Sequence, residues 1–283
     1  MMRRSLAILA FACFAAVAQP IVPNVLAPEF TSVVRISSTN GGGTNGSGTA
    51  INEFFVLTAK HVGGNWIQFG NAGSGAQTFQ AVERIAHPTA DIALLRFANP
   101  LPVFTSILFG DHLGATATMV GYGASGTLRA DGTGYDMWPN TSGAPGTRRK
   151  GNNVLDERFR ILPEHNFGSG VTNSLNFMFD LDGPTGNGST GGPAIAGEAS
   201  LGPGDSGGGT FRFVNNEWRL IGVNSFIWSV QNDGDYHDWG DGGGIVDLNE
   251  YQQWITTNAV PEPGTMLALA GGIAALALRR RRK

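Results

Sequence analysis

A chain of 283 residues, of which 41% are hydrophobic and 14% charged, can bury one large core or two smaller ones and does not have a disordered composition. It contains 42 glycines, and β-branched and aromatic residues are spread throughout, which favours an all-β protein with many turns. The formal net charge is −3, but without the seven basic residues and one acid at the two ends the body has 12 basic and 21 acidic residues, a balance of −9 that argues against nucleic acid as a partner.

The N-terminus has the order of a secretory signal peptide. Two arginines precede an alanine-rich apolar run at residues 6–17, and small residues then fit a cleavage site after residue 18. Residues 1–18 are therefore predicted to be a signal peptide. A retained membrane anchor is the alternative, but the run is short and Pro20 follows it closely. The single cysteine, Cys13, lies in this segment, so the mature protein would contain no disulfide.

After a proline-rich linker at residues 19–29, short apolar and β-branched runs alternate with glycine and asparagine turns. These runs predict strands at residues 30–37, 48–57 (two strands), 66–69, 78–85, 92–95, 116–123, 175–180, 210–214, 218–223 and 225–229, with a hairpin around Asn215 and Asn216. Residues 103–115 are interpreted as the link between two halves of the chain.

The remaining segments are interpreted as loops, apart from one helix near the end of the body. Residues 124–170 are turn-rich, and residues 182–197 and 232–244 are predicted to be long loops. A helix is expected over residues 248–258, where one tyrosine, one tryptophan and one isoleucine have helical spacing.

A histidine and an aspartate each lie at the edge of a predicted buried strand. His61 follows the strand that ends near Leu57, a position equally compatible with a packed core histidine. Asp91 opens the apolar run at residues 92–95, although aspartate is rare in strands. A buried carboxylate needs a charged or hydrogen-bonded partner, and His61 is the natural candidate.

Residues 202–209, Gly-Pro-Gly-Asp-Ser-Gly-Gly-Gly, surround Ser206 with neighbours that lack side chains. Glycine lets a ligand approach the backbone closely, and a nucleophilic serine needs nearby N–H groups directed at the oxygen that becomes negative. Taken alone, the run is also compatible with a glycine-rich loop that happens to contain a serine.

Histidine, aspartate and serine occur in that order, and the chain resembles the trypsin/chymotrypsin-like serine proteases over most of residues 30–258. Four stretches carry the resemblance: residues 48–62, which end in Thr-Ala-Lys-His-Val; residues 87–95, with His-Pro before the aspartate strand; residues 121–123, Gly-Tyr-Gly; and residues 204–208, Gly-Asp-Ser-Gly-Gly.

The resemblance implies an all-β fold of two antiparallel six-stranded Greek-key β-barrels with a C-terminal helix. The N-terminal barrel would cover residues 30–110 and contain His61 and Asp91, and the C-terminal barrel and helix would cover residues 111–259 and contain Ser206. The active site would lie in the cleft between the barrels.

The resemblance also implies acyl transfer by a Ser-His-Asp triad. Ser206 would attack a peptide carbonyl, His61 would accept and return the proton, and Asp91 would fix the histidine tautomer. The N–H groups of Gly204 and Ser206 would form the oxyanion hole. The family's zymogen terminus, which pairs with the aspartate before the serine, has only a weak match at the Ile-Val-Pro of residues 21–23, so Asp205 could use another partner.

The same resemblance suggests the substrate pocket. Ser200 falls where the family places the pocket floor, and trypsin-like enzymes have aspartate there. Ser225, Phe226 and Ile227 match the strand that pairs with substrate backbone, with Ile227 in place of a usual glycine. A bulky wall predicts a preference for small apolar side chains. The alternative is attraction of a basic side chain by the acids of the 232–244 loop, namely Asp233, Asp235, Asp238 and Asp241.

No cofactor and no metal ligand set is predicted. The acidic loop at residues 232–244 admits a calcium hypothesis, but it lacks EF-hand spacing, and a solvated loop is favoured. His112, His165 and His237 have no metal spacing and are interpreted as surface or packing residues.

The C-terminus resembles the PEP-CTERM sorting signal of Gram-negative bacteria. Pro261, Glu262 and Pro263 precede an apolar run at residues 265–278 and a cluster of five basic residues. In that family an exosortase recognises the tail, so residues 260–283 imply contact with export machinery and exosortase and a transient membrane association. A plain C-terminal membrane anchor is the alternative.

Together these features predict a secreted serine endopeptidase that acts on proteins or peptides and is exported to the cell surface or extracellular matrix of a Gram-negative bacterium. The competing hypothesis is a non-catalytic surface- or matrix-binding protein on a protease scaffold. The sorting tail suits both, whereas three complete triad residues favour the enzyme.

Overall fold

The computed structural model describes residues 25–137, 139, 143–167, 170–183, 186, 188–230 and 234–260. The predicted signal peptide at residues 1–18 and the sorting motif Pro261, Glu262 and Pro263 lie outside these residues. No helix in the described part of the chain is long and apolar enough to cross a membrane.

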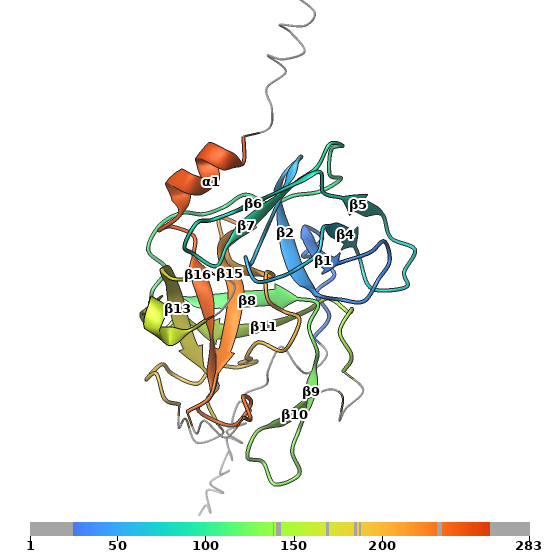
Figure 1. Cartoon of the computed structure of the whole chain (residues 1–283). Coiled ribbons are helices and arrows are strands. Elements are labelled where there is room, and N and C mark those ends of the chain that lie inside the picture. The colour runs from blue at the N-terminus through green and yellow to red at the C-terminus, as the bar shows by residue number, and fades with distance from the viewer. Residues whose placement is uncertain are drawn as a thin grey trace, which may run out of the picture.

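The first half of the chain forms an antiparallel sheet with the order β5-β4-β1-β2-β3-β7-β6. Its strands are β1 (Val33–Ser37), β2 (Gly46–Asn52), β3 (Phe55–Thr58), β4 (Trp66–Phe69), β5 (Thr78–Gln80), β6 (Glu83–Ala86) and β7 (Ala93–Arg96). In Figure 1 these strands are coloured blue to teal.

The second half forms another antiparallel sheet, with the order β11-β8-β14-β15-β16-β13-β12. Its strands are β8 (Thr116–Gly121), β11 (Arg149–Val154), β12 (Glu157–Ile161), β13 (Ser174–Asp180), β14 (Gly209–Val214), β15 (Glu217–Trp228) and β16 (Gly242–Asp247). A separate hairpin, β9 (Gly126–Leu128) and β10 (Tyr135–Met137), extends away from this sheet in Figure 1. The helical segments are the 3₁₀ turn η1 (Pro163–His165) and the helix α1 (Gln252–Asn258).

Each sheet closes because one run of chain bends and pairs with a different neighbour on each side of the bend. Only two residues separate β5 from β6, and only two separate β11 from β12. If each bent run counts as one strand, both halves have six strands in the same cyclic order, 1-2-3-6-5-4 along the chain. The predicted all-β fold of two six-stranded Greek-key barrels is confirmed.

The structure departs from the strand prediction mainly in the second half. The segment interpreted as turn-rich contains β9 to β12, and the end of the predicted 232–244 loop begins β16. Gly243 and Gly244 of β16 lie against the rings of Phe179 and Phe226, where a Cβ atom would collide with them. Glycine is generally depleted in strands, so strand propensity argues against a strand here. The packing that requires glycine in β16 becomes apparent only in the tertiary structure.

The turn between β14 and β15 agrees with the sequence prediction. Asn215 and Asn216 both adopt positive φ, at 53° and 65°, and connect β14 to β15. This is the backbone expected of a two-residue hairpin whose turn matches the twist of its strands. The predicted hairpin around these two residues is therefore present.

One large hydrophobic cluster extends across both barrels, and a smaller one lies in the second barrel alone. A single cluster of buried side chains includes Val34 and Leu57 of the first barrel together with Tyr122, Phe211 and Val246 of the second half. A smaller cluster, which includes Phe177 and Phe179, fills the second barrel. The first sheet ends at Arg96 and the second begins at Thr116, and the division at residues 110 and 111 stays a prediction.

Both ends of the described body pack back onto the barrels. Residues 25–27 pair with β11, since Leu26 forms a β-bridge to Arg149. The helix α1 is shorter than the predicted helix over residues 248–258. The ring centroid of Trp254 lies 5.1 Å from that of His87, and the ring centroid of Tyr251 lies 5.0 Å from it.

The His87 ring accepts hydrogen bonds from the N–H groups of Thr89 and Ala90, which fixes the turn before Asp91.

The side chain of Ser47, in β2, joins the barrels at their centre. Its hydroxyl donates to the carbonyl of Gly204 at 2.9 Å and accepts from the N–H of Tyr122 at 2.9 Å. The N–H of Ser47 donates to the carbonyl of Ser206 at 2.8 Å. One fully buried residue of the first barrel therefore holds the serine loop of the second.

We expect Ser47→Ala to lower the free energy of unfolding by about 1–3 kcal/mol, because it leaves the buried N–H of Tyr122 and carbonyl of Gly204 without partners. Urea unfolding followed by tryptophan fluorescence measures the change. Ser38→Ala is the matched control, since Ser38 is exposed and accepts only from the amide of Asn45. A loss for Ser47→Ala no larger than that of the control would contradict the inter-barrel role.

Candidate active site

The structure brings His61 and Asp91 together at the end of two adjacent strands of the first barrel. His61 follows β3 and Asp91 precedes β7, and these strands pair with each other. The Nδ1 atom of His61 lies 2.8 Å from Oδ2 of Asp91, and the backbone N–H of His61 donates to Oδ1 at 3.1 Å. The Asp91 side chain is fully buried, whereas the His61 side chain keeps 25% of its surface exposed. The carboxylate therefore fixes the ring, and the ring edge that carries Nε2 remains available.

A β-bulge supplies a third hydrogen-bond donor for the Asp91 carboxylate, after the ring and the backbone N–H of His61. The pairing of β15 with β16 shifts register between Asn224 and Phe226, so Ser225 is an extra residue in β15. Bulges redirect side chains near functional sites. The Ser225 hydroxyl donates to Oδ2 of Asp91 at 2.5 Å. Sequence reasoning assigned Ser225 to the pocket wall and did not foresee this contact, because a bulge depends on the register of two strands.

The loop around Ser206 depends on glycine at two positions. Gly204 and Gly207 have φ values of 97° and 84°, a region that other residues rarely adopt. At Gly207 a side chain would also collide with Ser47 and Thr58 of the first barrel. The other glycines of the run are closely packed as well, since a Cβ atom at Gly208 would collide with the carbonyl of Val120 and one at Gly209 with the ring of Phe211.

Ser206 is partly exposed at the boundary between the barrels. Its hydroxyl donates to the carbonyl of Ser225 at 3.3 Å, a long distance for an O–H donor. No hydrogen bond joins Ser206 to His61 in the described chain, although both side chains line one pocket. Catalytic hydrogen bonds are often loose before substrate binds, so this geometry does not exclude transfer of a proton between them.

The backbone N–H groups of Gly204 and Ser206 have no hydrogen-bond acceptor among the residues that the structure describes. Their neighbours in the loop are engaged. The N–H of Asp205 donates to Gly202, and the N–H groups of Gly207 and Gly208 donate to Asn224 and Asp205. The two N–H groups predicted for an oxyanion hole are therefore the two that this loop leaves unused.

Asp205 is fully buried and is held inside the chain. Its carboxylate accepts from the N–H of Gly123 at 2.7 Å and the N–H of Gly202 at 2.9 Å. Burial raises the pKa of Asp205 to about 6, and the nearby positive charge of Arg149 opposes that rise. Arg149, in β11, is itself buried and donates to the carbonyl of Gly123 at 3.0 Å. Sequence reasoning left the partner of Asp205 open, and it did not single out Arg149.

The pocket beside His61 and Ser206 has a volume of about 510 Å³ and a largely apolar lining. Besides those two residues, it is lined by Phe167, Leu201, Gly202, Pro203, Ser225, Phe226, Ile227 and Tyr236. The predicted wall residues Ser225, Phe226 and Ile227 are present. Ser200, the predicted floor, is fully buried and does not line the pocket. Phe167 and Tyr236 lie in loops without a recognisable motif, so sequence reasoning missed them.

The acidic loop does not bring its described carboxylates to the pocket surface. Asp235 and Asp238 form ion pairs with Arg129. Asp241 is buried and accepts from the N–H of Val230 at 2.9 Å and the N–H of Asp238 at 2.9 Å. Asp233 lies outside the described residues. The described acids thus have partners of their own, which weakens the alternative of attraction to a basic substrate.

The other predicted packing histidines bond to backbone atoms. His112 and His237 are buried, and their Nε2 atoms lie 3.0 Å from the carbonyls of Leu108 and Leu201. Burial lowers the pKa of His237. His165 accepts from the N–H of Leu162 at 2.7 Å.

Comparison with known families supports both resemblances found in the sequence. A family model described as trypsin matches residues 25–255. A second, described as a PEP-CTERM protein-sorting motif, matches residues 259–282. No curated protein matches the chain.

We expect Arg149→Met to lower the free energy of unfolding by roughly 1–3 kcal/mol at pH 8, since it removes a buried charged donor and leaves Asp205 without its nearby cation. The pKa of Asp205 is higher in the folded chain than in the unfolded chain. Its contribution to stability is therefore complete below the unfolded pKa and is lost as the pH rises through about 6, where the buried carboxyl ionises. The loss caused by Arg149→Met should therefore be smaller at pH 5, where Asp205 is protonated.

Urea unfolding at pH 5 and pH 8 tests this expectation. Arg148→Met is the matched control, because Arg148 donates to the carbonyl of Ala27 and to Tyr122 rather than facing Asp205. Its effect should be the same at both pH values. An equally pH-independent loss for Arg149→Met would mean that Arg149 acts only through its hydrogen bonds to carbonyls.

Proposed function

Because the chain belongs to the trypsin family, we propose that it is an exported serine endopeptidase that hydrolyses peptide bonds through an acyl-enzyme. The observation that carries this proposal is the Asp91–His61 pair, whose histidine lines the same pocket as Ser206. Two unused N–H groups on the Ser206 loop add to it.

In the proposed mechanism Ser206 Oγ attacks the carbonyl carbon of the scissile bond. His61 Nε2 accepts the hydroxyl proton and later donates it to the leaving amine. Asp91 keeps the proton of the neutral ring on Nδ1 and stabilises the imidazolium, and the hydroxyl of Ser225 helps to hold that carboxylate in place. Water then attacks the acyl-enzyme by the reverse path, with His61 as the base.

The N–H groups of Gly204 and Ser206 would bind the oxyanion of each tetrahedral intermediate. Such donors act strongly because they are oriented before the reaction begins, and the loss of one typically costs about 2.7–4 kcal/mol of barrier. The positive φ of Gly204 and the attachment of the loop to Ser47 support this orientation.

The sorting signal indicates export and sorting to the cell surface in Gram-negative bacteria. We further propose that an exosortase processes the tail near Pro261, Glu262 and Pro263 after the signal peptide at residues 1–18 has been removed. The enzyme would then act at the surface or in the extracellular matrix, on protein or peptide substrates.

The competing function is a binding protein on a protease scaffold. The bond from Ser206 to the Ser225 carbonyl, rather than to His61, is the one contact that favours it. The unused N–H pair of the loop favours the enzyme, because a purely structural loop gains nothing by leaving two donors unsatisfied.

We expect the full-length chain to be labelled by a fluorophosphonate probe, and Ser206→Ala and His61→Ala to abolish the labelling. Either substitution should lower kcat/KM for a peptide substrate by about 10⁴–10⁶-fold, since serine and histidine act as a unit. Ser38→Ala is the control and should be labelled like the parent chain. Well-folded parent protein that is not labelled would support the binding protein instead.

The apolar pocket supports a preference for small apolar side chains at the residue before the scissile bond. We expect Ile227→Gly to widen the pocket and raise kcat/KM for leucine or phenylalanine at that position by about 10–200-fold relative to alanine. Cleavage of a peptide library by both proteins measures the change. Val82→Gly, at an exposed site in the first barrel, controls for a general effect of added glycine.

Two library results would contradict this specificity. Cleavage dominated by arginine or lysine would mean that acidic groups govern the pocket after all. An unchanged profile in Ile227→Gly would mean that Ile227 does not limit the pocket's depth.

A further inference from the structure

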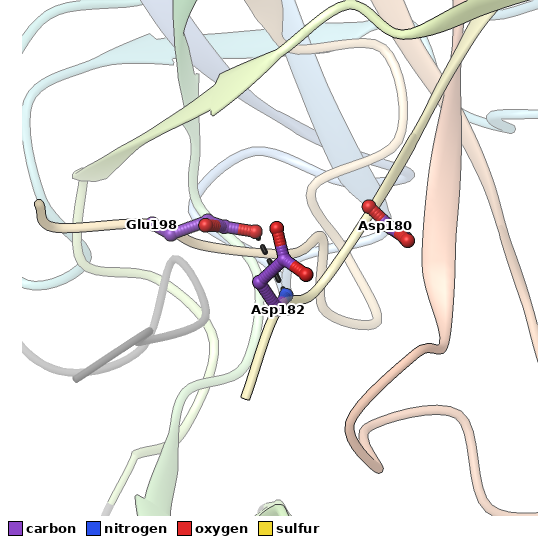
Figure 2. Close-up of side chains that lie close together, drawn as sticks. All are labelled: Asp180, Asp182 and Glu198. Carbon is purple, nitrogen blue, oxygen red and sulfur yellow. Dashed lines mark hydrogen bonds between the residues drawn. The ribbon is translucent and has the colours of Figure 1, made fainter. Parts of the chain in front are cut away.

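Three buried carboxylates gather beside the second barrel, outside the proposed catalytic site. Asp180 ends β13, Asp182 follows two residues later, and Glu198 lies near the end of the following loop, two residues before Ser200. Each of the three residues is about 1% exposed. One oxygen from each carboxylate lies within 4.8 Å of the others. Figure 2 shows the Asp182 carboxylate between the other two.

The hydrogen bonds of this cluster leave a fully buried oxygen of Asp182 without a partner. Glu198 accepts from the N–H of Asp182 at 2.8 Å and the N–H of Ile195 at 2.9 Å. Asp180 accepts from the N–H groups of Ser189 and Thr190 through a single oxygen, Oδ2. Oδ1 of Asp182 is buried and has no hydrogen-bond partner. Buried polar atoms are nearly always paired, so an unpaired carboxylate oxygen among other carboxylates points to a missing ligand.

A fourth acid adds to the negative charge. Asp156 lies in the bend between β11 and β12, and its Oδ1 is also buried without a partner. Its Oδ2 accepts from the hydroxyl of Thr190 at 2.8 Å. Thr190 also donates its N–H to Asp180, so Asp156 lies beside the cluster.

No basic side chain in the described chain forms an ion pair with any of these four acids. Buried charges are stable only when they are paired or bound to a metal ion. The alternative is that the carboxylates share protons. A cation removes the repulsion among all of them at once and also supplies a partner for the unpaired oxygens.

We propose that Asp180, Asp182 and Glu198 bind a calcium ion, with Asp156 adding negative charge nearby. Every available donor is an oxygen, and most are carboxylate oxygens, which calcium prefers. Zinc favours nitrogen and sulfur donors, and none is present in the cluster. The site differs from the acidic loop at residues 232–244, for which the sequence had suggested a calcium hypothesis.

The bound ion would connect the loop after β13 to the segment that forms the pocket. The amide of Asn153, in β11, already donates to the carbonyls of Asp180 and Ala199, and so bridges the two ends of this loop. Ala199 leads through Ser200 into Leu201 and Gly202, which line the pocket. Calcium would therefore stabilise the fold at the base of the pocket.

The test uses the full-length chain with Ser206→Ala, so that self-cleavage cannot affect the result and the proposed catalysis is not required. After treatment with a chelator and dialysis, calorimetric titration with CaCl₂ should give one ion per chain. A hundredfold excess of Ca²⁺ over its Kd should raise Tm by about 5–10 °C.

Asp182→Asn and Glu198→Gln, each in this background, should weaken binding at least tenfold and remove the rise in Tm. Circular dichroism reports whether each variant is folded, and Glu198→Gln carries the test if Asp182→Asn is not. Asp235→Asn, in the rival acidic loop, is the control and should bind like the parent. The proposal is overturned if Ca²⁺ gives no binding heat and no change in Tm, or if Asp235→Asn abolishes binding while the other two variants retain it.

Discussion

The hydrogen bonds of Ser47 to the Ser206 loop are the constraint on which the rest of the site depends. His61 and Asp91 belong to the first barrel and Ser206 to the second, so the three meet only if the barrels keep one relative position. Ser47 binds the carbonyls of Gly204 and Ser206 on either side of Asp205. The hydrophobic cluster that extends across both barrels also keeps them in this relative position.

Buried charge is the second theme of this structure. Cys13 is the only cysteine of the chain, so the chain can form no internal disulfide, and several buried acids are held instead by backbone N–H groups. Asp205 lies near the positive charge of Arg149, and Asp91 is hydrogen-bonded to His61 and Ser225. The acids around Asp182 have no such partner among the described residues, which is why a cation is the natural complement.

The pocket beside His61 and Ser206 is formed by residues from several distant segments. Its walls come from the β15 bulge and from loops that lie far apart in sequence, and its surface is mainly aromatic and aliphatic. The bulge serves two sites at once, because Ser225 contacts Asp91 while Phe226 and Ile227 face the pocket. A change in this strand would therefore alter substrate preference and the position of the carboxylate together.

The sequence by itself determined the family, the two-barrel fold and the candidates His61, Asp91 and Ser206, because those features depend on local motifs and on strand patterns that each segment carries alone. It also indicated the Asn215–Asn216 turn, whose backbone is set by two residues. Tertiary structure alone decided the roles of Ser47 and Arg149, the second contact of Ser225, the glycine-rich strand β16 and the gathering of Asp180 with Glu198. Each of these depends on which strands pair, in what register, and what packs against them, and such contacts leave no periodic signal in the chain.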